Sequence, residues 1–167
     1  MNNKIYIKIL DNEIWISKNN KLYKEKTNTI LENNFITNYK VLETNLKQII
    51  NKYKLTNLII QNKIYIIINK LYCETNLFIL KTIMYNLGLS NYKLLYEEDL
   101  YKDIYPNILS IWKINGIYIY NNVENYIDIN NKNDIKKIST NTLLITSNKD
   151  ILNILKKELI LYENDTN

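Results

Sequence analysis

The stretch from Ile64 to Asp99 constrains the fold more than any other part of this sequence. The apolar run "IYIIIN" opens it, a segment of helical period follows over residues 73–87, and the apolar run "YKLLY" comes after Gly88. Gly88 stands where a helix that stops needs a residue in the left-handed conformation. Strand, helix and strand in this order predict a right-handed crossover in a parallel sheet. The predicted buried stripe of the helix comprises Leu77, Leu80, Ile83, Met84 and Leu87.

The residues before this stretch extend the same pattern. "KIYIKILDNEIWIS" and "LYKEKTNTI" alternate apolar and polar residues around "KNNK", which predicts three antiparallel strands with a turn at "KNNK". Residues 39–54 change to a helical period, and the almost entirely apolar residues 57–69 predict one or two buried strands. The predicted buried face of this helix comprises Val41, Leu42, Leu46, Ile49, Ile50 and Tyr53.

The second half repeats the pattern more loosely. Residues 107–122 are predicted to form a hairpin that turns at Asn115 and Gly116, because Asn-Gly favours two-residue turns. "YIDI" and "TLLIT" predict further strands, and a closing helix begins near Asp150. An antiparallel meander joined to parallel crossovers gives a predicted fold class of α/β.

Composition narrows the chemistry that the chain can perform. The 167 residues include no alanine, arginine or histidine, and all 22 basic residues are lysine, a usage that strongly A+T-rich coding DNA explains. Without histidine the chain lacks the usual general base and metal ligand, and Cys73 has no second cysteine for a disulfide or zinc site. The net charge of +5 could indicate binding to nucleic acid. However, the lysines are scattered among acidic residues and the chain has no arginine, so we interpret them as solvated surface residues rather than a nucleic-acid patch.

The sequence also allows a prediction of the cellular compartment. No apolar run is long enough to span a membrane, and the first residues alternate like a strand rather than a signal peptide. Together with the single cysteine, this predicts a soluble protein of the cytoplasm, or of an organelle matrix or stroma.

Two segments carry a more specific pattern. Residues 36–52, "ITNYKVLETNLKQIINK", contain the spacing V-x-E-x-x-L-x-x-x-I-x-K, and the crossover of residues 64–99 ends in Glu97-Glu98-Asp99. Both resemble segments of the MreB family of bacterial actins, in which the crossover ends in Glu-Glu-Pro. The resemblance implies an actin-like (RNase H-like) fold of βββαβα lobes with the outer subdomains missing. It implies a first lobe over residues 1–99 and a truncated second lobe over residues 100–167.

The positions that bind nucleotide in that family are altered here. The first phosphate loop, Asp-x-Gly-Thr in the family, corresponds to "YIKILDN", and the second, Asp-x-Gly-Gly-Gly-Thr, corresponds to "SIWKIN". Glycines in such loops let backbone N–H groups approach the phosphates. The resemblance implies that Ser110 replaces a metal-facing acid and that Asn76 replaces the glutamate that polarises water. The remaining replaced positions are Trp112, Lys113 and Ile114 for the glycines, and Thr146, Ser147, Asn148 and Lys149 for the adenosine-binding turn.

These replacements predict a protein without ATP hydrolysis. Each missing backbone hydrogen bond to phosphate forfeits about 1.5–3 kcal/mol, so no cofactor or metal is expected and only weak ATP binding is compatible with the loops. Lys113 is expected to be a surface lysine rather than a phosphate ligand. Glu97, Glu98 and Asp99 are interpreted as a strand end at the sheet edge where α/β ligands bind.

Three functions follow from these observations. The resemblance favours a degenerate actin-like scaffold of a cytoskeletal, cell-shape or division apparatus, with a protein partner or self-association through edge strands at "KIYIKIL" and "GIYIY". The alternative is an RNA- or ribosome-associated protein of an A+T-rich organelle or reduced genome, with base stacking on strand tyrosines. These strand tyrosines are Tyr92, Tyr96, Tyr118 and Tyr120, and packing is their favoured role. The third function, a nucleotide-binding enzyme, is the weakest of the three.

Overall fold

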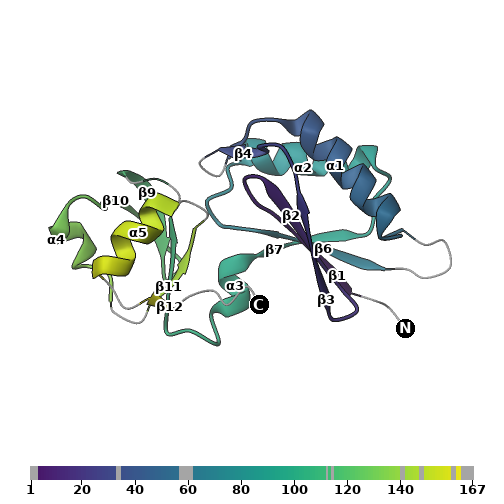
Figure 1. The fold of residues 1–167 in the computed structure, drawn as a ribbon. Coiled ribbons are helices and arrows are strands. Elements are labelled where there is room, and N and C mark those ends of the chain that lie inside the picture. The colour runs from purple at the N-terminus through teal and green to yellow at the C-terminus, as the bar shows by residue number, and fades with distance from the viewer. Residues whose placement is uncertain are drawn as a thin grey trace. The chain divides into compact units, whose positions relative to one another are not determined.

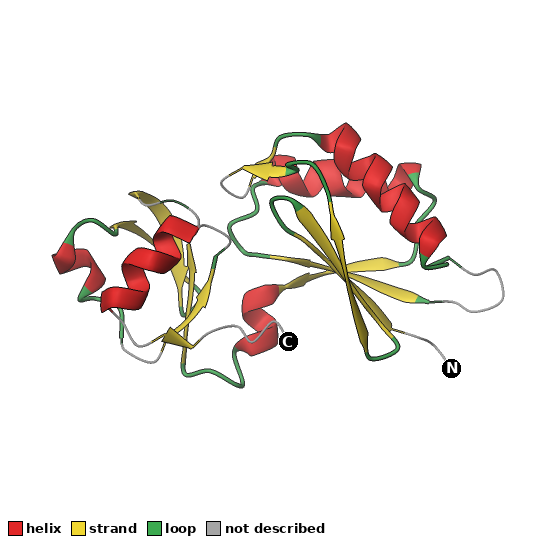
Figure 2. Cartoon of the chain, viewed as in Figure 1, coloured by secondary structure: helices red, strands yellow, loops and turns green. Residues whose placement is uncertain are grey.

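The computed structural model describes residues 4–32, 35–56, 62–111, 113, 115–139, 142–146, 149–158 and 161–162 (Figures 1 and 2). The chain divides into two compact units. Unit 1 contains Met1–Ile68 and Tyr72–Leu95, and unit 2 contains Asn69–Leu71 and Tyr96–Asn167. The chain therefore passes between the units after Ile68, after Leu71 and after Leu95.

Unit 1 is built on a five-stranded sheet of order β3-β2-β1-β6-β7. Strands β1 (Lys4–Ile9), β2 (Glu13–Lys18) and β3 (Lys21–Lys26) form an antiparallel meander, and β6 (Lys63–Ile68) lies parallel to β1. Strand β7 (Tyr92–Tyr96) completes the sheet beside β6, which confirms the predicted meander and the predicted strand–helix–strand unit. Residues 57–61 of the predicted buried strand region lie outside the described residues.

Two helices cover one face of this sheet (Figure 1). Helix α1 (Tyr39–Lys52) follows the short hairpin of β4 (Leu31–Glu32) and β5 (Phe35–Ile36), and helix α2 (Glu74–Asn86) joins β6 to β7. Their apolar stripes face the sheet because the helical period returns an apolar side chain to the same side every three or four residues. The buried helix residues in this core are Leu42, Leu46, Ile49, Ile50, Leu80, Ile83 and Met84.

Both helices end in the same hydrogen-bonded motif. At α2 the Gly88 amide donates to the Tyr85 carbonyl (3.0 Å) and the Leu89 amide to the Met84 carbonyl (2.9 Å), with Gly88 at φ +69°. This is the Schellman arrangement, and it confirms Gly88 as the helix stop. At α1 the corresponding left-handed residue is Lys54, at φ +49°.

Unit 2 repeats the topology of unit 1. Its five-stranded sheet has the order β10-β9-β8-β11-β12, with β8 (Asn107–Ile111), β9 (Asn115–Tyr120) and β10 (Val123–Asp128) as the antiparallel meander. Strand β11 (Thr142–Ile145) lies parallel to β8, and β12 (Leu161–Tyr162) lies parallel to β11. Helices α4 (Lys132–Ile135) and α5 (Lys149–Glu158) occupy the two connections, and α3 (Glu97–Tyr101) precedes the sheet. Each unit thus carries the βββαβα order.

The predicted hairpin of residues 107–122 is confirmed, because β8 pairs antiparallel with β9, but its predicted turn is wrong. Asn115 and Gly116 lie inside β9, paired with Asp128 and Ile127 of β10, so they are not the predicted two-residue turn. The turn between β9 and β10 is Asn121-Asn122, with φ of +50° and +66°. Asparagine tolerates the left-handed conformation that such a turn requires, and pairing with β10 holds the Asn-Gly dipeptide extended.

The two strands expected at sheet edges are central strands. The stretches "KIYIKIL" and "GIYIY" are not edges, because β1 lies between β2 and β6 and β9 lies between β8 and β10. The sequence of a single strand does not distinguish an edge from a central position, because strand order depends on pairing between distant segments. The packing role expected of the β9 tyrosines is confirmed: Tyr118 is buried in the core of unit 2, and Tyr120 packs against that core.

Candidate functional site

The loop that the resemblance aligns with the first phosphate loop is a tight connection of residues 10–12 between β1 and β2. The Asp11 carbonyl accepts hydrogen bonds from the Ile30 amide (2.6 Å) and the Leu31 amide (3.3 Å), and the Asn12 carbonyl accepts from the Thr27 amide (2.8 Å). None of residues 10–12 has a positive φ. The loop therefore lacks the left-handed backbone that turns successive N–H groups towards a phosphate, and its carbonyl oxygens hold the chain that follows β3.

Asn76 lies in the first turn of α2 and is fully buried. Its Oδ1 accepts a hydrogen bond of 3.0 Å from the Ile36 amide in β5. The side chain therefore fastens the β4–β5 hairpin to the helix and satisfies a buried main-chain donor. An amide in this place has no basic group to accept a proton from water.

The positions in unit 2 are spread along one sheet. Ser110 lies within β8 between Ile119 of β9 and Ile145 of β11, and it is fully buried with no hydrogen-bond partner for its Oγ among the described residues. Lys113 is exposed in the connection between β8 and β9, as expected of a surface lysine. Thr146 follows β11 and is partly buried. Trp112, Ser147 and Asn148 lie outside the described residues.

The acidic segment Glu97-Glu98-Asp99 begins helix α3 directly after β7. Three acidic residues in a first helical turn interact favourably with the helix dipole, so the segment starts a helix as well as ending a strand. Both oxygens of Glu98 accept from the Lys70 amide at 3.1 Å. The Lys70 Nζ donates to Asp99 (2.8 Å) and to Asn122 (2.7 Å), so Lys70 links α3 to the turn between β9 and β10.

Glu98 is an almost fully buried carboxyl group. Burial raises the pKa of Glu98 above its ordinary value, and the neighbouring Glu97 charge adds to the increase. Hydrogen bonds from the backbone amides of Glu98 and Lys70 lower the pKa of Glu98 in part. A buried carboxyl group of this kind can hold a proton that an exposed glutamate would lose.

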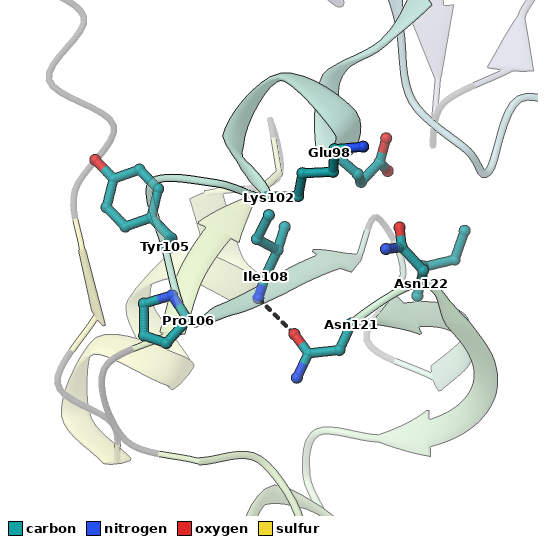
Figure 3. A pocket seen from close by; sticks show the side chains of 8 residues that line it. Glu98, Lys102, Tyr105, Pro106, Ile108, Asn121 and Asn122 are labelled. Atoms are coloured by element: carbon teal, nitrogen blue, oxygen red, sulfur yellow. Dashed lines mark hydrogen bonds between the residues drawn. The ribbon is translucent and has the colours of Figure 1, made fainter.

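A pocket of about 210 Å³ opens beside this carboxyl group within unit 2 (Figure 3). Glu98 lines it from α3, Lys102 from the position directly after α3, Ile108 from β8, and Asn121 from the turn after β9. The Ile108 amide donates to Asn121 Oδ1 at 2.9 Å, so the turn asparagine is fixed against the first residues of the strand. The pocket contains one acid and one lysine, and its described lining has no thiol or imidazole that could serve as a nucleophile or base.

Solved structures resemble this arrangement of strands. The crystal structure of MreB5 of Spiroplasma citri bound to ADP matches with a TM-score of 0.58 and 13% sequence identity, over 77% of this chain and 53% of the MreB5 chain. The chain has an actin-like fold. It spans about half the length of the MreB5 chain. A structure of the Aquifex aeolicus PPX-GPPA enzyme matches over 87% of this chain and 67% of that chain, at 12% identity, but its TM-score of 0.33 is too low to support an inference.

No protein-family model and no curated protein matches the sequence. The actin-like fold therefore rests on the repeated topology and on the structural match, and at 13% identity the match shows the fold alone. Among the described residues no cluster of acidic or cysteine side chains could hold a metal ion. In the same part of the chain, no helix combines the length and the apolar character that crossing a membrane requires.

The sequence did not indicate Lys70 or Asn122 as partners of the acidic segment. Lys70 lies 28 residues before Glu98 and 52 residues before Asn122, and neither separation corresponds to a local pattern. The available signal was the acidic triplet itself, because carboxyl groups that become buried at the end of a strand need polar partners. The partner could be identified only once the β6–α2 loop was placed beside α3.

Proposed function

We propose that this chain is an actin-fold protein that acts through contact with other proteins, as a structural or scaffold component of a cell-shape or division apparatus, and that it does not hydrolyse ATP. The observation that carries the proposal is the buried Asn76 amide, which holds the Ile36 main chain where the resemblance places a catalytic glutamate. The loop of residues 10–12 supports it, since its carbonyl groups are occupied by the following chain.

Nucleotide binding provides the first test. Titration of the full chain with a fluorescent ATP analogue and Mg²⁺ should give no saturation in the micromolar range, and phosphate release should equal that of a protein-free blank. The MreB5 protein, whose structure contains ADP, is the matched positive control. Micromolar affinity or Mg²⁺-dependent hydrolysis by this chain would contradict the proposal.

The edge strand β10 is the surface through which we expect self-association. It borders β9 on one side only, and its Tyr126 is 67% exposed opposite the exposed Ile117 of β9. The other meander edge, β3, carries Lys21, Lys24 and Lys26, and lysines on an edge strand discourage pairing with another chain. The β10 edge is therefore the better candidate for contact between copies.

Sedimentation and negative-stain microscopy test this surface. The wild-type chain should form oligomers or filaments, and Tyr126→Lys should shift it to a monomer because the added charge opposes strand pairing. Tyr85→Lys is the control, since Tyr85 is 84% exposed on α2 and undergoes the same change of charge. A wild-type monomer that also retains no protein partner in pull-downs would rule out the contact-based role.

A further inference from the structure

The sheet of unit 1 has a second face with an unusual set of side chains. We call it the open face: the alternate residues of β1, β2, β3 and β6 that begin with Lys4, Glu13, Leu22 and Lys63 and point away from α1 and α2. Both described helices of unit 1 pack on the opposite face. Its charged residues are one acid, Glu13, and the lysines Lys4, Lys8, Lys24, Lys26 and Lys63.

Unit 2 shows what the same topology looks like when both faces are covered. Its β8 and β11 are buried at almost every position, because Leu109 and Leu144 face α4 and α5 while Ile108 and Leu143 pack with Leu71, Tyr101 and Tyr105. In β1 and β6 only alternate residues are buried. The unit 1 sheet therefore has the composition of a sheet with one face in contact with solvent or a polar partner.

Aromatic rings on the open face lie on adjacent central strands. Tyr6 of β1 and Tyr65 of β6 are paired in register, and their rings stack with centroids 5.1 Å apart and an interplanar angle of 19°. On the other side of Tyr6 the paired residue is Ser17 of β2, whose side chain is small. The small Ser17 side chain therefore leaves room for a planar group to stack on Tyr6 on the side opposite Tyr65.

A third ring is held next to this row. The Trp15 Nε1 donates to Glu13 Oε2 at 2.8 Å, which fixes the indole. The Lys24 Nζ lies 4.3 Å and the Lys8 Nζ 5.9 Å from the centre of the Trp15 ring. The face thus interleaves aromatic rings with positive charge, the combination that binds bases and phosphates of a single strand.

We propose that the open face binds single-stranded nucleic acid. Bases stack on Tyr6, Tyr65 and Trp15, and the lysines beside the aromatic row contact the phosphates. An acidic peptide would match the charge but would leave the planar rings without a planar partner. The site is independent of the proposed scaffold role, and it lies on tyrosines other than the strand pairs that sequence alternation indicated.

Fluorescence anisotropy of the full chain with labelled oligo(U) and oligo(dT) tests the proposal. Binding should weaken steeply between low and physiological salt, because phosphate contacts release counterions. Tyr6→Ala and Tyr65→Ala should each weaken binding about tenfold, whereas Tyr6→Phe and Tyr65→Phe should retain it, because stacking needs the ring and not the hydroxyl group. The RNA and DNA arms show whether the 2′-hydroxyl contributes.

Paired charge reversals provide the control. Lys4→Glu with Lys63→Glu should weaken binding and reduce the slope of log K against log salt by about 0.7 for each phosphate that is no longer neutralised. Lys47→Glu with Lys81→Glu, on exposed positions of α1 and α2, should leave binding unchanged. Equal weakening by both pairs, wild-type binding by folded alanine variants, or binding of poly-glutamate but of neither oligonucleotide would overturn the proposal. Circular dichroism of each variant establishes that it is folded.

Discussion

Single residues in this chain occupy backbone conformations that glycine would adopt elsewhere. The left-handed positions among the described residues are Gly88 and five non-glycine residues, Asn19, Asn20, Lys54, Asn121 and Asn122. Asparagine tolerates this conformation, but lysine incurs a steric penalty of about 1–2 kcal/mol there. Lys54 is therefore the residue whose identity conflicts most clearly with its conformation.

Replacing Lys54 with glycine should stabilise unit 1 by about 0.5–1 kcal/mol. Glycine relieves the left-handed strain at the end of α1, and its greater freedom in the unfolded chain offsets part of this gain. Gly88→Ala, in the same motif at the end of α2, should destabilise by about 1–2 kcal/mol; no neighbouring atom lies within 4 Å of the added Cβ, so the cost is one of backbone conformation. Urea denaturation of both variants measures the change in the free energy of unfolding. Changes of the same sign in the two variants would show that the shared motif does not control stability at these sites.

Glu98 should make stability depend on pH. Its pKa is raised in the folded state above the ordinary value of 4.5, so its contribution is full below pH 4.5 and declines as pH rises through the raised pKa. The neutral variant Glu98→Gln lacks this decline. The stability of the variant relative to wild type should therefore increase between pH 4 and pH 7 in urea titrations, and a difference that stays constant with pH would show that Glu98 is ionised normally.

At the scale of elements, the two units use the same turn chemistry. The β2–β3 turn is Asn19-Asn20 and the β9–β10 turn is Asn121-Asn122, all with positive φ. The second turn carries additional hydrogen bonds, because Asn121 Oδ1 accepts from the Ile108 amide and Asn122 Oδ1 from Lys70. The turns are thus equivalent in backbone but not in side-chain contacts.

This difference predicts unequal effects of alanine. Asn20→Ala removes only the tolerance for the left-handed conformation, because the exposed Asn20 side chain makes no hydrogen bond to the described part of the chain. Asn121→Ala also removes a bond of 2.9 Å to a main-chain amide, and should cost about 1 kcal/mol more. Thermal unfolding of the two variants measures the difference, and a larger effect at Asn20 would refute the account.

Elements were predictable from sequence where the signal was local. The crossover of residues 64–96 and its stop at Gly88 follow from apolar period and one glycine, and the structure has both. The turn at Asn115-Gly116 and the expected edge strands were wrong, because register and strand order depend on distant partners such as β10 and β6. The same limit applies to function, since the stacking of Tyr6 on Tyr65 requires the β1–β6 pairing.

At the scale of the whole molecule, the described core is divided between the units. One buried cluster contains residues of unit 1 alone, among them Ile7 and Leu46, and two others contain residues of unit 2, among them Leu109 and Leu143. A cavity made in one cluster therefore leaves the packing of the others intact.

Leu46→Ala should loosen one unit only. Removing a fully buried leucine side chain should destabilise unit 1 by about 2–5 kcal/mol. Hydrogen exchange followed by mass spectrometry should show faster exchange in peptides from β1, β2, α1 and α2, and unchanged exchange in peptides from β8, β9 and β11. Leu144→Ala in unit 2 is the reciprocal variant, and a uniform increase over all peptides in either case would mean that the units unfold together.

The assignment of Asn69–Leu71 to unit 2 has a practical consequence for dissecting the protein. If the chain is divided after Leu95, residues 69–71 remain in the first half. Glu98 in the second half then loses the Lys70 amide, which donates to both of its carboxylate oxygens. The second half should then be poorly soluble when produced alone. Co-expression of the two halves should restore its solubility, because the first half supplies residues 69–71 when the halves associate.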